Sequence, residues 1–246
     1  MKNIDLVIVY NNPPLMEQLE QSVQKTLPED MAYHLIALDN TGKAYSSAAA
    51  AYNHALRGGY CRSEVVIFCH QDIVFLEGCL ENIYNTCRRQ PRCLYGAAGI
   101  VWSGGRINDN ITVSSMAQNQ EDWRYNTLPE GEERDVHTLD ECLVAGSREL
   151  FETLSYDEIL CDGWHFYTVE LSLRCHTMNI PVRALDANMI HLSSGTPDAN
   201  FYRCEKRIAK KYRKYFPVLR YSSGWCYTNP VKYFLQNLYR KLRYKI

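Results

Sequence analysis

Short apolar runs of strand length alternate with helix-like segments through the first hundred residues, and this alternation restricts the fold more than any other feature. The run Val65 to Cys69 is continuously apolar, as expected for a strand that is buried on both faces of a sheet. Strands that alternate with helices predict an α/β domain with one mainly parallel central sheet and helices on both faces. The expected order is strand 4–10, helix 15–26, strand 33–39, helix 48–56, a strand from residue 65, helix 77–89 and strand 94–101.

The rest of the chain continues this plan less regularly. Residues 103–135 are polar and rich in turn-forming residues, which predicts an excursion or β-ribbon and not a packed core element. The later expected elements are a strand and short helix within 139–151, a helix over 166–176 and a strand over 182–191. No linker rich in glycine or serine divides the chain. We therefore expect one domain over residues 1–216 and an extension over residues 217–246.

Composition and charge exclude several classes of protein. The 246 residues are 46% hydrophobic and 22% charged, as in globular proteins. Lysine plus arginine, 27 in all, nearly balance the 28 acidic residues, so no overall field attracts nucleic acid. The ten cysteines include no CxxC pair for a zinc site and favour a reducing cytoplasm. The first apolar run is too short for a signal peptide, and no run reaches membrane-spanning length.

Two candidate metal ligands follow the strand that begins at Val65. His70 and Asp72 stand two positions apart, which places both side chains on the same side of an extended chain. The carboxyl ends of strands are where α/β proteins bind ligands. The imidazole and the carboxylate could therefore share a divalent cation. Asp72 could equally cap the turn that follows the strand.

The candidate polar residues fall into blocks along the chain. The blocks are Tyr10-Asn11, Asp39-Asn40, Tyr52-Asn53, 68–72, 139–144, 163–174 and 191–195. In this order they resemble the family 2-like glycosyltransferases with the GT-A fold, most closely the branch named after a streptomycin-biosynthesis protein. The resemblance implies inverting, metal-dependent transfer of a sugar from a nucleotide-diphosphate donor to a hydroxyl of a glycan or lipid-linked acceptor. A dinucleotide-binding oxidoreductase is disfavoured, because the first strand is followed by Asn11-Asn12-Pro13-Pro14 and not by GxGxxG.

The resemblance also implies roles for the donor half. Asp72 matches the last position of the family's Asp-x-Asp-like metal motif, His70 replaces the first acid, and His191 matches a late position that reaches the same diphosphate or metal. Imidazole ligands make Mn²⁺ a better candidate than Mg²⁺. The residues implied to contact the donor nucleotide are Tyr10, Asn11, Asp39, Asn53 and Gln71. Without the resemblance, Asp39 is an Asx-turn residue in Asp-Asn-Thr-Gly, and His191 is structural.

The catalytic base is where the sequence departs from the family. The position of the family's carboxylate matches Thr168, whose hydroxyl cannot act as a general base at neutral pH. Asp162 and His165 are the preferred replacements, because on a helix Glu170 is turned away from Thr168 and would pair with Arg174 at i+4. Because this carboxylate is missing, a second function is also compatible with the sequence. In this alternative the protein has the same fold, is catalytically impaired and only binds a nucleotide sugar or glycan.

Two further residues are implied on the acceptor side. Asp140 follows a strand that enters the cleft and could contact the acceptor or the sugar. Trp164 could form a stacking platform for a sugar ring, although a tryptophan beside a helix start is as often part of the core.

Basic residues crowd the sequence from Arg203 onward. Between them, over residues 231–244, aromatic and aliphatic residues recur at helical spacing. A basic amphipathic helix with aromatic residues is typical of segments that lie on an anionic membrane surface. We therefore expect a cytoplasmic protein with peripheral contact to the inner face of the membrane. The alternative is a helix that packs on its own domain with a solvated basic face.

Overall fold

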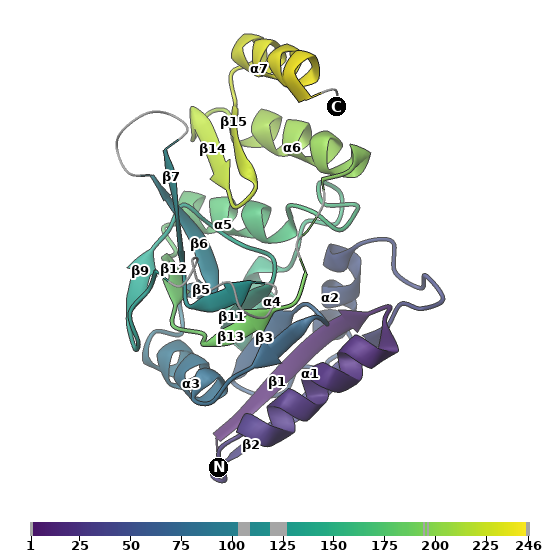
Figure 1. The fold of residues 1–246 in the computed structure, drawn as a ribbon, viewed down its shortest axis with the longest axis vertical. Coiled ribbons are helices and arrows are strands. Elements are labelled where there is room, and N and C mark those ends of the chain that lie inside the picture. Colours follow the sequence, from purple (N-terminus) through teal and green to yellow (C-terminus); the bar gives the residue numbers. More distant parts are fainter. Residues whose placement is uncertain (1, 103–108, 119–126, 194, 196, 245–246) are drawn as a thin grey trace.

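The computed structural model describes residues 2–102, 109–118, 127–193, 195 and 197–244 (Figure 1). A seven-stranded sheet forms its centre, in the order β2-β1-β3-β11-β5-β12-β9. The strands are β1 (Lys2–Tyr10), β2 (Met31–Asp39), β3 (Val65–Cys69), β5 (Leu94–Gly96), β9 (Glu133–Asp135), β11 (Leu143–Ser147) and β12 (Val182–Leu185).

The direction of the strands differs from the expectation. β1 is parallel to β2 and β3, and β12 is parallel to β5. In contrast, β11 is antiparallel to both of its neighbours, β3 and β5, and β9 is antiparallel to β12. The α/β class is confirmed, but the central sheet is mixed and not mainly parallel. A continuous apolar run indicates that a strand is buried, but it does not indicate whether the strand is parallel or antiparallel to its neighbours.

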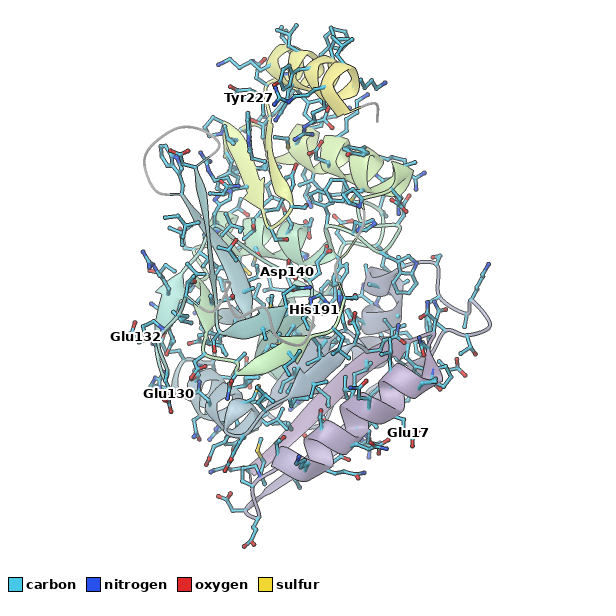
Figure 2. The ribbon with its side chains drawn as sticks, viewed as in Figure 1. Glu17, Glu130, Glu132, Asp140, His191 and Tyr227 are labelled. Carbon is cyan, nitrogen blue, oxygen red and sulfur yellow. The ribbon has the colours of Figure 1, made fainter. Side chains whose placement is uncertain are left out.

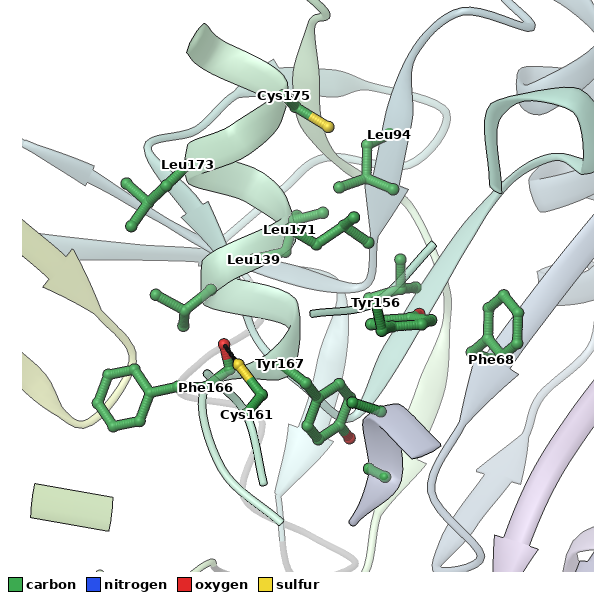
Figure 3. Close-up of a cluster of buried hydrophobic side chains, with 14 of the residues drawn as sticks. Phe68, Leu94, Leu139, Tyr156, Cys161, Phe166, Tyr167, Leu171, Leu173 and Cys175 are labelled. Carbon is green, nitrogen blue, oxygen red and sulfur yellow. Dashed lines mark hydrogen bonds between the residues drawn. The ribbon is translucent and has the colours of Figure 1, made fainter. Parts of the chain in front are cut away.

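Helices cover both faces of the sheet, as expected. α1 (Pro13–Thr26) and α3 (Cys79–Arg89) pack on one face, and α2 (Ala48–Arg57), α4 (Arg148–Leu154) and α5 (Tyr167–Thr177) pack on the other. Side chains alternate along a strand, so β1 contributes side chains to the packing on both faces of the sheet. Its Leu6 packs with Leu19 of α1, whereas Val7 packs with the cluster that includes α2 and α5. Figure 3 shows aromatic and aliphatic side chains of this second cluster around α5.

Two segments that were expected as single strands are each divided between two sheets. Residues 94–101 form β5 and then β6 (Ala98–Trp102), which pairs with β7 (Asn110–Ser114) and β10 (Thr138–Leu139). Residues 182–191 form β12 and then β13 (Met189–His191), which pairs with β4 (Ile73–Phe75) and β8 (Met116–Gln118). The interruption between β12 and β13 begins at Asp186. Its buried carboxylate accepts hydrogen bonds from the Ser115 hydroxyl and, at 2.9 Å, from Gly131 N, which draw the chain away from β12.

The expected excursion over residues 103–135 is only partly described, since 103–108 and 119–126 lie outside the described residues. Its described parts include β7, which forms an antiparallel ribbon with β6. Val113, Ala117 and Leu128 are buried. This segment therefore contributes to the packed core, against the expectation from its polar composition.

The C-terminal part packs onto the rest of the molecule. α6 (Ala199–Tyr212) is followed by the hairpin of β14 (Val218–Tyr221) and β15 (Gly224–Tyr227) and by α7 (Pro230–Tyr244). The expected boundary at residue 216 falls between α6 and β14. The buried Glu205 of α6 joins these elements, because it accepts hydrogen bonds from Tyr233 and Arg240 of α7. Among the residues described, no helix is long and apolar enough to cross a bilayer.

All ten cysteines are buried and unpaired by disulfides. Burial raises the pKa of Cys93 and of Cys175 to about 12. The thiols thus behave as small apolar side chains of the core.

Candidate functional site

The carboxyl ends of three parallel strands meet at one edge of the sheet. Tyr10 at the end of β1 is in register with Asp39 at the end of β2, and β3 delivers His70 to the same edge. A cavity of about 750 Å³ opens there. The residues that line it include Tyr10, Asn11, Asn40, Thr41, Lys43, Tyr45, Tyr52, His70, Gln71, Asp72, Trp164 and Tyr167.

The candidate nucleotide-binding residues Asn11 and Gln71 are locked together. Gln71 Oε1 accepts hydrogen bonds from Asn11 N at 3.0 Å and Asn12 N at 2.8 Å, and its Nε2 donates to Asn11 Oδ1 at 2.8 Å. The loops after β1 and β3 therefore form one wall of the cavity, beside Tyr10.

Asp39 and Asn53 have local partners. Asp39 Oδ1 accepts hydrogen bonds from Thr41 N at 2.8 Å and from Thr41 Oγ1 at 2.7 Å, which lower the pKa of its carboxyl and hold it at the strand end. Asn53 is fully buried and bonds the backbone N and O of Tyr156 and the Glu158 carboxylate. It does not line the cavity. The described partners of the Asn53 side chain are therefore protein groups, and the nucleotide contact implied by the sequence stays a prediction.

His70, Asp72 and His191 converge beside the cavity. Their ligand atoms all lie within 4.8 Å of one another. Asp72 Oδ1 lies 3.9 Å from His70 Nδ1 and 3.6 Å from His191 Nε2. The pairing of β13 with β4 brings His191 opposite Ile73 and thus next to Asp72. His70 Nε2 is 2.9 Å from the Tyr167 hydroxyl, which fixes the ring.

The electrostatics of this cluster keep Asp72 ionised. Burial alone would raise the pKa of Asp72, but the nearby His191, His70 and Ser193 outweigh it and hold the pKa well below its usual range. Burial, together with His191, lowers the pKa of His70. For His191, burial opposes the charged form, but the Asp72 carboxylate outweighs it and raises the pKa.

The donor set fits a divalent cation. Two imidazole nitrogens and one carboxylate suit Mn²⁺ and related ions better than Mg²⁺, which prefers oxygen ligands. His191 Nε2 is buried, and its 3.6 Å separation from Asp72 Oδ1 is too long for a hydrogen bond. Within the described part of the chain it has no other hydrogen-bond partner. A cation held by these three residues would satisfy that nitrogen.

The loop between β10 and β11 approaches the same cluster. Asp140 interacts electrostatically with both His70 and His191, and Figure 2 shows it near His191 at the middle of the molecule. Burial would raise the pKa of Asp140, but Ser222 and the Cys142 N–H outweigh it and lower the pKa. Burial raises the pKa of the adjacent Glu141 well above its usual range.

The two expected catalytic residues lie in different surroundings. Asp162 faces α6, where Arg207 binds its two carboxylate oxygens at 2.5 Å and 3.1 Å, so its pKa is lowered. His165 Nε2 lies 3.5 Å from Asp198 Oδ1, its ring lies 5.5 Å from that of Phe201, and it interacts electrostatically with His70. Burial lowers the pKa of His165, with Asp198 acting in the opposite direction. Trp164, 41% exposed, lines the cavity beside it.

Thr168 and Glu170 are both fully buried in α5. Among the residues that the structure describes, none forms a hydrogen bond with the Thr168 hydroxyl, which lies in the packed core. Glu170 pairs with Arg174 at 3.2 Å, as the helical spacing predicts, and with Lys211 at 2.7 Å.

Sequence reasoning missed two residues at this site. Tyr167 lines the cavity and bonds His70, and Lys43 brings a cation to the cavity wall. Lys43 follows the turn after Asp39 in the sequence, a position that could have identified it. Nothing local in the sequence marks the contact between Tyr167 and His70.

Comparisons with solved structures establish the fold class. GalNAc-T7 with UDP, GalNAc and Mn²⁺ superimposes with a TM-score of 0.61 at 12% identity, over 86% of this chain and 48% of that chain. The mannosyltransferase PcManGT from Pyrobaculum calidifontis, in complex with GDP-Man and Mn²⁺, gives 0.51 at 14% identity, over 86% and 62%. These identities show the fold alone, which is the GT-A fold.

Sequence comparisons establish the family. A protein of Fuscovulum blasticum described as "ATP synthase subunits region ORF 6" is 27% identical over 165 residues, which are 64% of this chain and 63% of that protein. The chain therefore spans less than two thirds of the length of the relatives it matches. The family model described as "Glycosyltransferase like family" matches residues 6–246. The chain belongs to this glycosyltransferase-like family.

Proposed function

We propose that this protein transfers a sugar from a nucleotide-diphosphate donor to a hydroxyl of a glycan or lipid-linked acceptor, with inversion and with Mn²⁺ preferred over Mg²⁺. The observation that carries the proposal is the convergence of His70, Asp72 and His191 beside the 750 Å³ cavity at the strand ends. A bound cation would neutralise charge on the departing diphosphate. The segments 163–174 and 191–195 support the streptomycin-biosynthesis-type branch of the family, although Ser194 lies outside the described residues.

Different residues at the cavity would contact the nucleotide-sugar donor and the acceptor. Tyr10, Asn11 and Gln71 form the wall for the base and ribose, and Asp39, in register with Tyr10 at the end of β2, would contact the same part of the donor. Trp164 would stack on a sugar ring, since one face of such a ring is apolar. Asp140 would contact the acceptor or the transferred sugar next to the metal ligands.

His165 is the proposed general base. Its lowered pKa keeps the imidazole neutral at pH 7, and a neutral imidazole can accept the proton of the acceptor hydroxyl. Asp162 is less suited to this role, because its two oxygens are held by Arg207 on the side of α6.

Calorimetry with UDP and GDP, with and without Mn²⁺, tests the metal and donor site. Asp72→Ala should abolish the Mn²⁺-dependent part of nucleotide binding, because Asp72 is the central ligand. Asp135→Ala, which changes an exposed aspartate on edge strand β9, should leave binding intact. Equal Mn²⁺-dependent binding by both variants would exclude the metal role of Asp72.

A second candidate function is a nucleotide-sugar or glycan-binding protein without transferase activity. The observation that favours it is the buried Thr168 hydroxyl, at the position where the family has a carboxylate and without a hydrogen bond to any described residue. Hydrolysis of the donor by the purified protein separates the two candidates, since a binding protein would hold the donor without cleaving it.

Contact of α7 with the inner face of a membrane forms the last part of the proposal. α7 turns its polar side inward, where Tyr233 and Arg240 bond Glu205 and Gln236 bonds the backbone of Tyr227 and Trp225. Its outward side is apolar. The exposed apolar residues are Val231, Phe234, Leu235, Leu238, Tyr239 and Leu242, 46–78% exposed.

Cations flank this outward face and complement an anionic bilayer. Lys232, Lys241 and Arg243 lie on α7, while Lys245 lies outside the described residues. Burying one such apolar side chain contributes about 1.5–3 kcal/mol, so a few of them with nearby cations would support reversible attachment of a cytoplasmic protein.

Sedimentation with anionic vesicles tests this contact. Phe234→Gln/Leu238→Gln/Leu242→Gln should stop sedimentation and leave the contacts of Glu205 in place. Ile159→Gln/Met178→Gln, which changes exposed apolar residues elsewhere, is the control. Sedimentation of the α7 variant at the level of the control would refute membrane contact through this face.

A further inference from the structure

A second cavity lies between the C-terminal hairpin, the end of α6 and the start of α7, and we call it the basic cavity. Its volume is about 800 Å³, and it shares none of its described lining residues with the donor cavity. The described residues that line it are Trp102, Arg213, Lys214, Pro217, Val218, Arg220, Tyr227, Thr228, Asn229, Pro230 and Lys232.

The lining is strongly positive. Four cations face the cavity: Arg213 and Lys214 from the end of α6, Arg220 from β14 and Lys232 from the first turn of α7. None of the described lining residues is acidic. Cations gathered around one cavity attract an anion to it.

Aromatic rings hold two of these cations in place. The Arg220 guanidinium carbon lies 4.7 Å from the centre of the Trp102 ring, and Lys232 Nζ lies 5.5 Å from the centre of the Tyr227 ring. Arg220 is 8% exposed, and its backbone oxygen accepts a hydrogen bond from Thr138 Oγ1 at 2.6 Å, which ties β14 to β10. The positive side of the cavity is therefore built on anchored elements and not on loose surface lysines alone.

The size and chemistry of the lining select the ligand class. Cavities of about 300–1,000 Å³ hold small organic molecules. Two planar guanidinium groups and two ammonium groups match the multiple oxygens and charge of a phosphate better than the two oxygens of one carboxylate. Trp102 and Tyr227 offer flat apolar surface to the organic part of the ligand.

We propose that the basic cavity is a second binding site, which takes the phosphate group of a small organic phosphate. Arg220 and Lys232 bind the phosphate from the hairpin and α7, and Arg213 and Lys214 close it in from α6. The phosphate has two chemical sources, a soluble phosphate ester or the headgroup of a phospholipid next to α7. This inference goes beyond the transferase function and does not depend on it.

Calorimetric titration of the full chain with sn-glycerol 3-phosphate, in the presence of a metal chelator, tests the soluble source. The variant Arg213→Gln/Lys214→Gln/Lys232→Gln changes only exposed side chains, so the fold should persist. One lost charge-assisted hydrogen bond costs about tenfold in affinity, and we expect at least that loss. Lys206→Gln/Lys210→Gln/Lys241→Gln removes the same charge from exposed positions outside the cavity and is the matched control.

Flotation with phosphatidylglycerol vesicles tests the lipid source with the same two variants. If only the cavity variant loses glycerol phosphate binding, the ligand is a soluble phosphate ester. If the unmodified protein does not bind glycerol phosphate and only the cavity variant loses vesicle binding, the ligand is a phospholipid headgroup. If the cavity variant and the control behave alike with both probes, the proposal is wrong. Nucleotide binding with Mn²⁺, which depends on Asp72, should stay unchanged in both variants. The basic-cavity proposal can therefore fail without affecting the transferase proposal.

Discussion

Replacing His137 should remove part of the acid sensitivity of the fold. His137 lies between β9 and β10, with its ring stacked 6.0 Å from that of His176 and 5.3 Å from that of Phe216. Burial, and then the nearby His176 and Arg220, lower the pKa of His137 from 6.5 to about 4. The folded protein thus holds this imidazole neutral over a range in which an exposed imidazole takes up a proton.

The sign and size of the effect follow from this difference in pKa. As pH falls, the unfolded chain binds the proton near pH 6.5 and the folded chain only near pH 4. Because the unfolded state binds the proton first, the free energy of unfolding decreases as pH falls between these values. The full decrease is about 3 kcal/mol, of which about 2 kcal/mol is reached by pH 5.

Urea denaturation at pH 7 and at pH 5 measures the effect. His137→Phe keeps an aromatic ring against Phe216 but cannot be protonated, so it should lose about 2 kcal/mol less than the unmodified protein between the two pH values. His54→Gln, at an exposed histidine, should behave like the unmodified protein. An equal loss in the unmodified protein and in His137→Phe would refute the reasoning, whatever the absolute stability of the variant.

Three further predictions concern named side chains. His165→Ala should lower turnover about 10²- to 10⁴-fold, whereas Asp162→Asn should change it little; comparable rates for both variants in a transfer assay would contradict the assignment. Thr168→Val replaces a buried hydroxyl that bonds none of the described residues, so it should raise the free energy of unfolding by about 1 kcal/mol with turnover retained. A lower melting temperature of this variant would oppose the prediction. Arg240→Gln leaves the Glu205 carboxylate buried with fewer partners and should cost about 3–5 kcal/mol in urea denaturation, most of which Glu205→Gln in the same chain should restore if the buried charge is the cause.

The sequence predicted the local parts of the fold well. Apolar periodicity located the helices on both faces and the strands that end at Tyr10, Asp39 and Cys69. It could not reveal that β11 runs antiparallel, since a strand buried on both faces has the same pattern in either direction. It also merged β12 with β13, because the break depends on the contacts of Asp186 with residues more than fifty positions away.

The same limit applies to the site. The spacing of His70 and Asp72 and the family resemblance predicted two neighbouring metal ligands, and the resemblance added His191. The Asn53 side chain is hydrogen-bonded to Tyr156, 103 residues away, and Asp162 is held by Arg207, 45 residues away. A polar residue can be recognised from sequence, but which long-range partner satisfies it depends on the packed structure.

The buried cysteines give the protein built-in reporters of local opening. A thiol reagent attacks the thiolate, so a buried thiol with a raised pKa reacts only after the segment around it opens. Cys69 reports on β3 in the central sheet, Cys175 on α5, and Cys226 on the C-terminal hairpin. The labelling rate of each thiol therefore measures how often its own segment unfolds. A ligand in the donor cavity should slow the modification of Cys69, and one in the basic cavity that of Cys226, so the two sites can be followed separately in a single reaction.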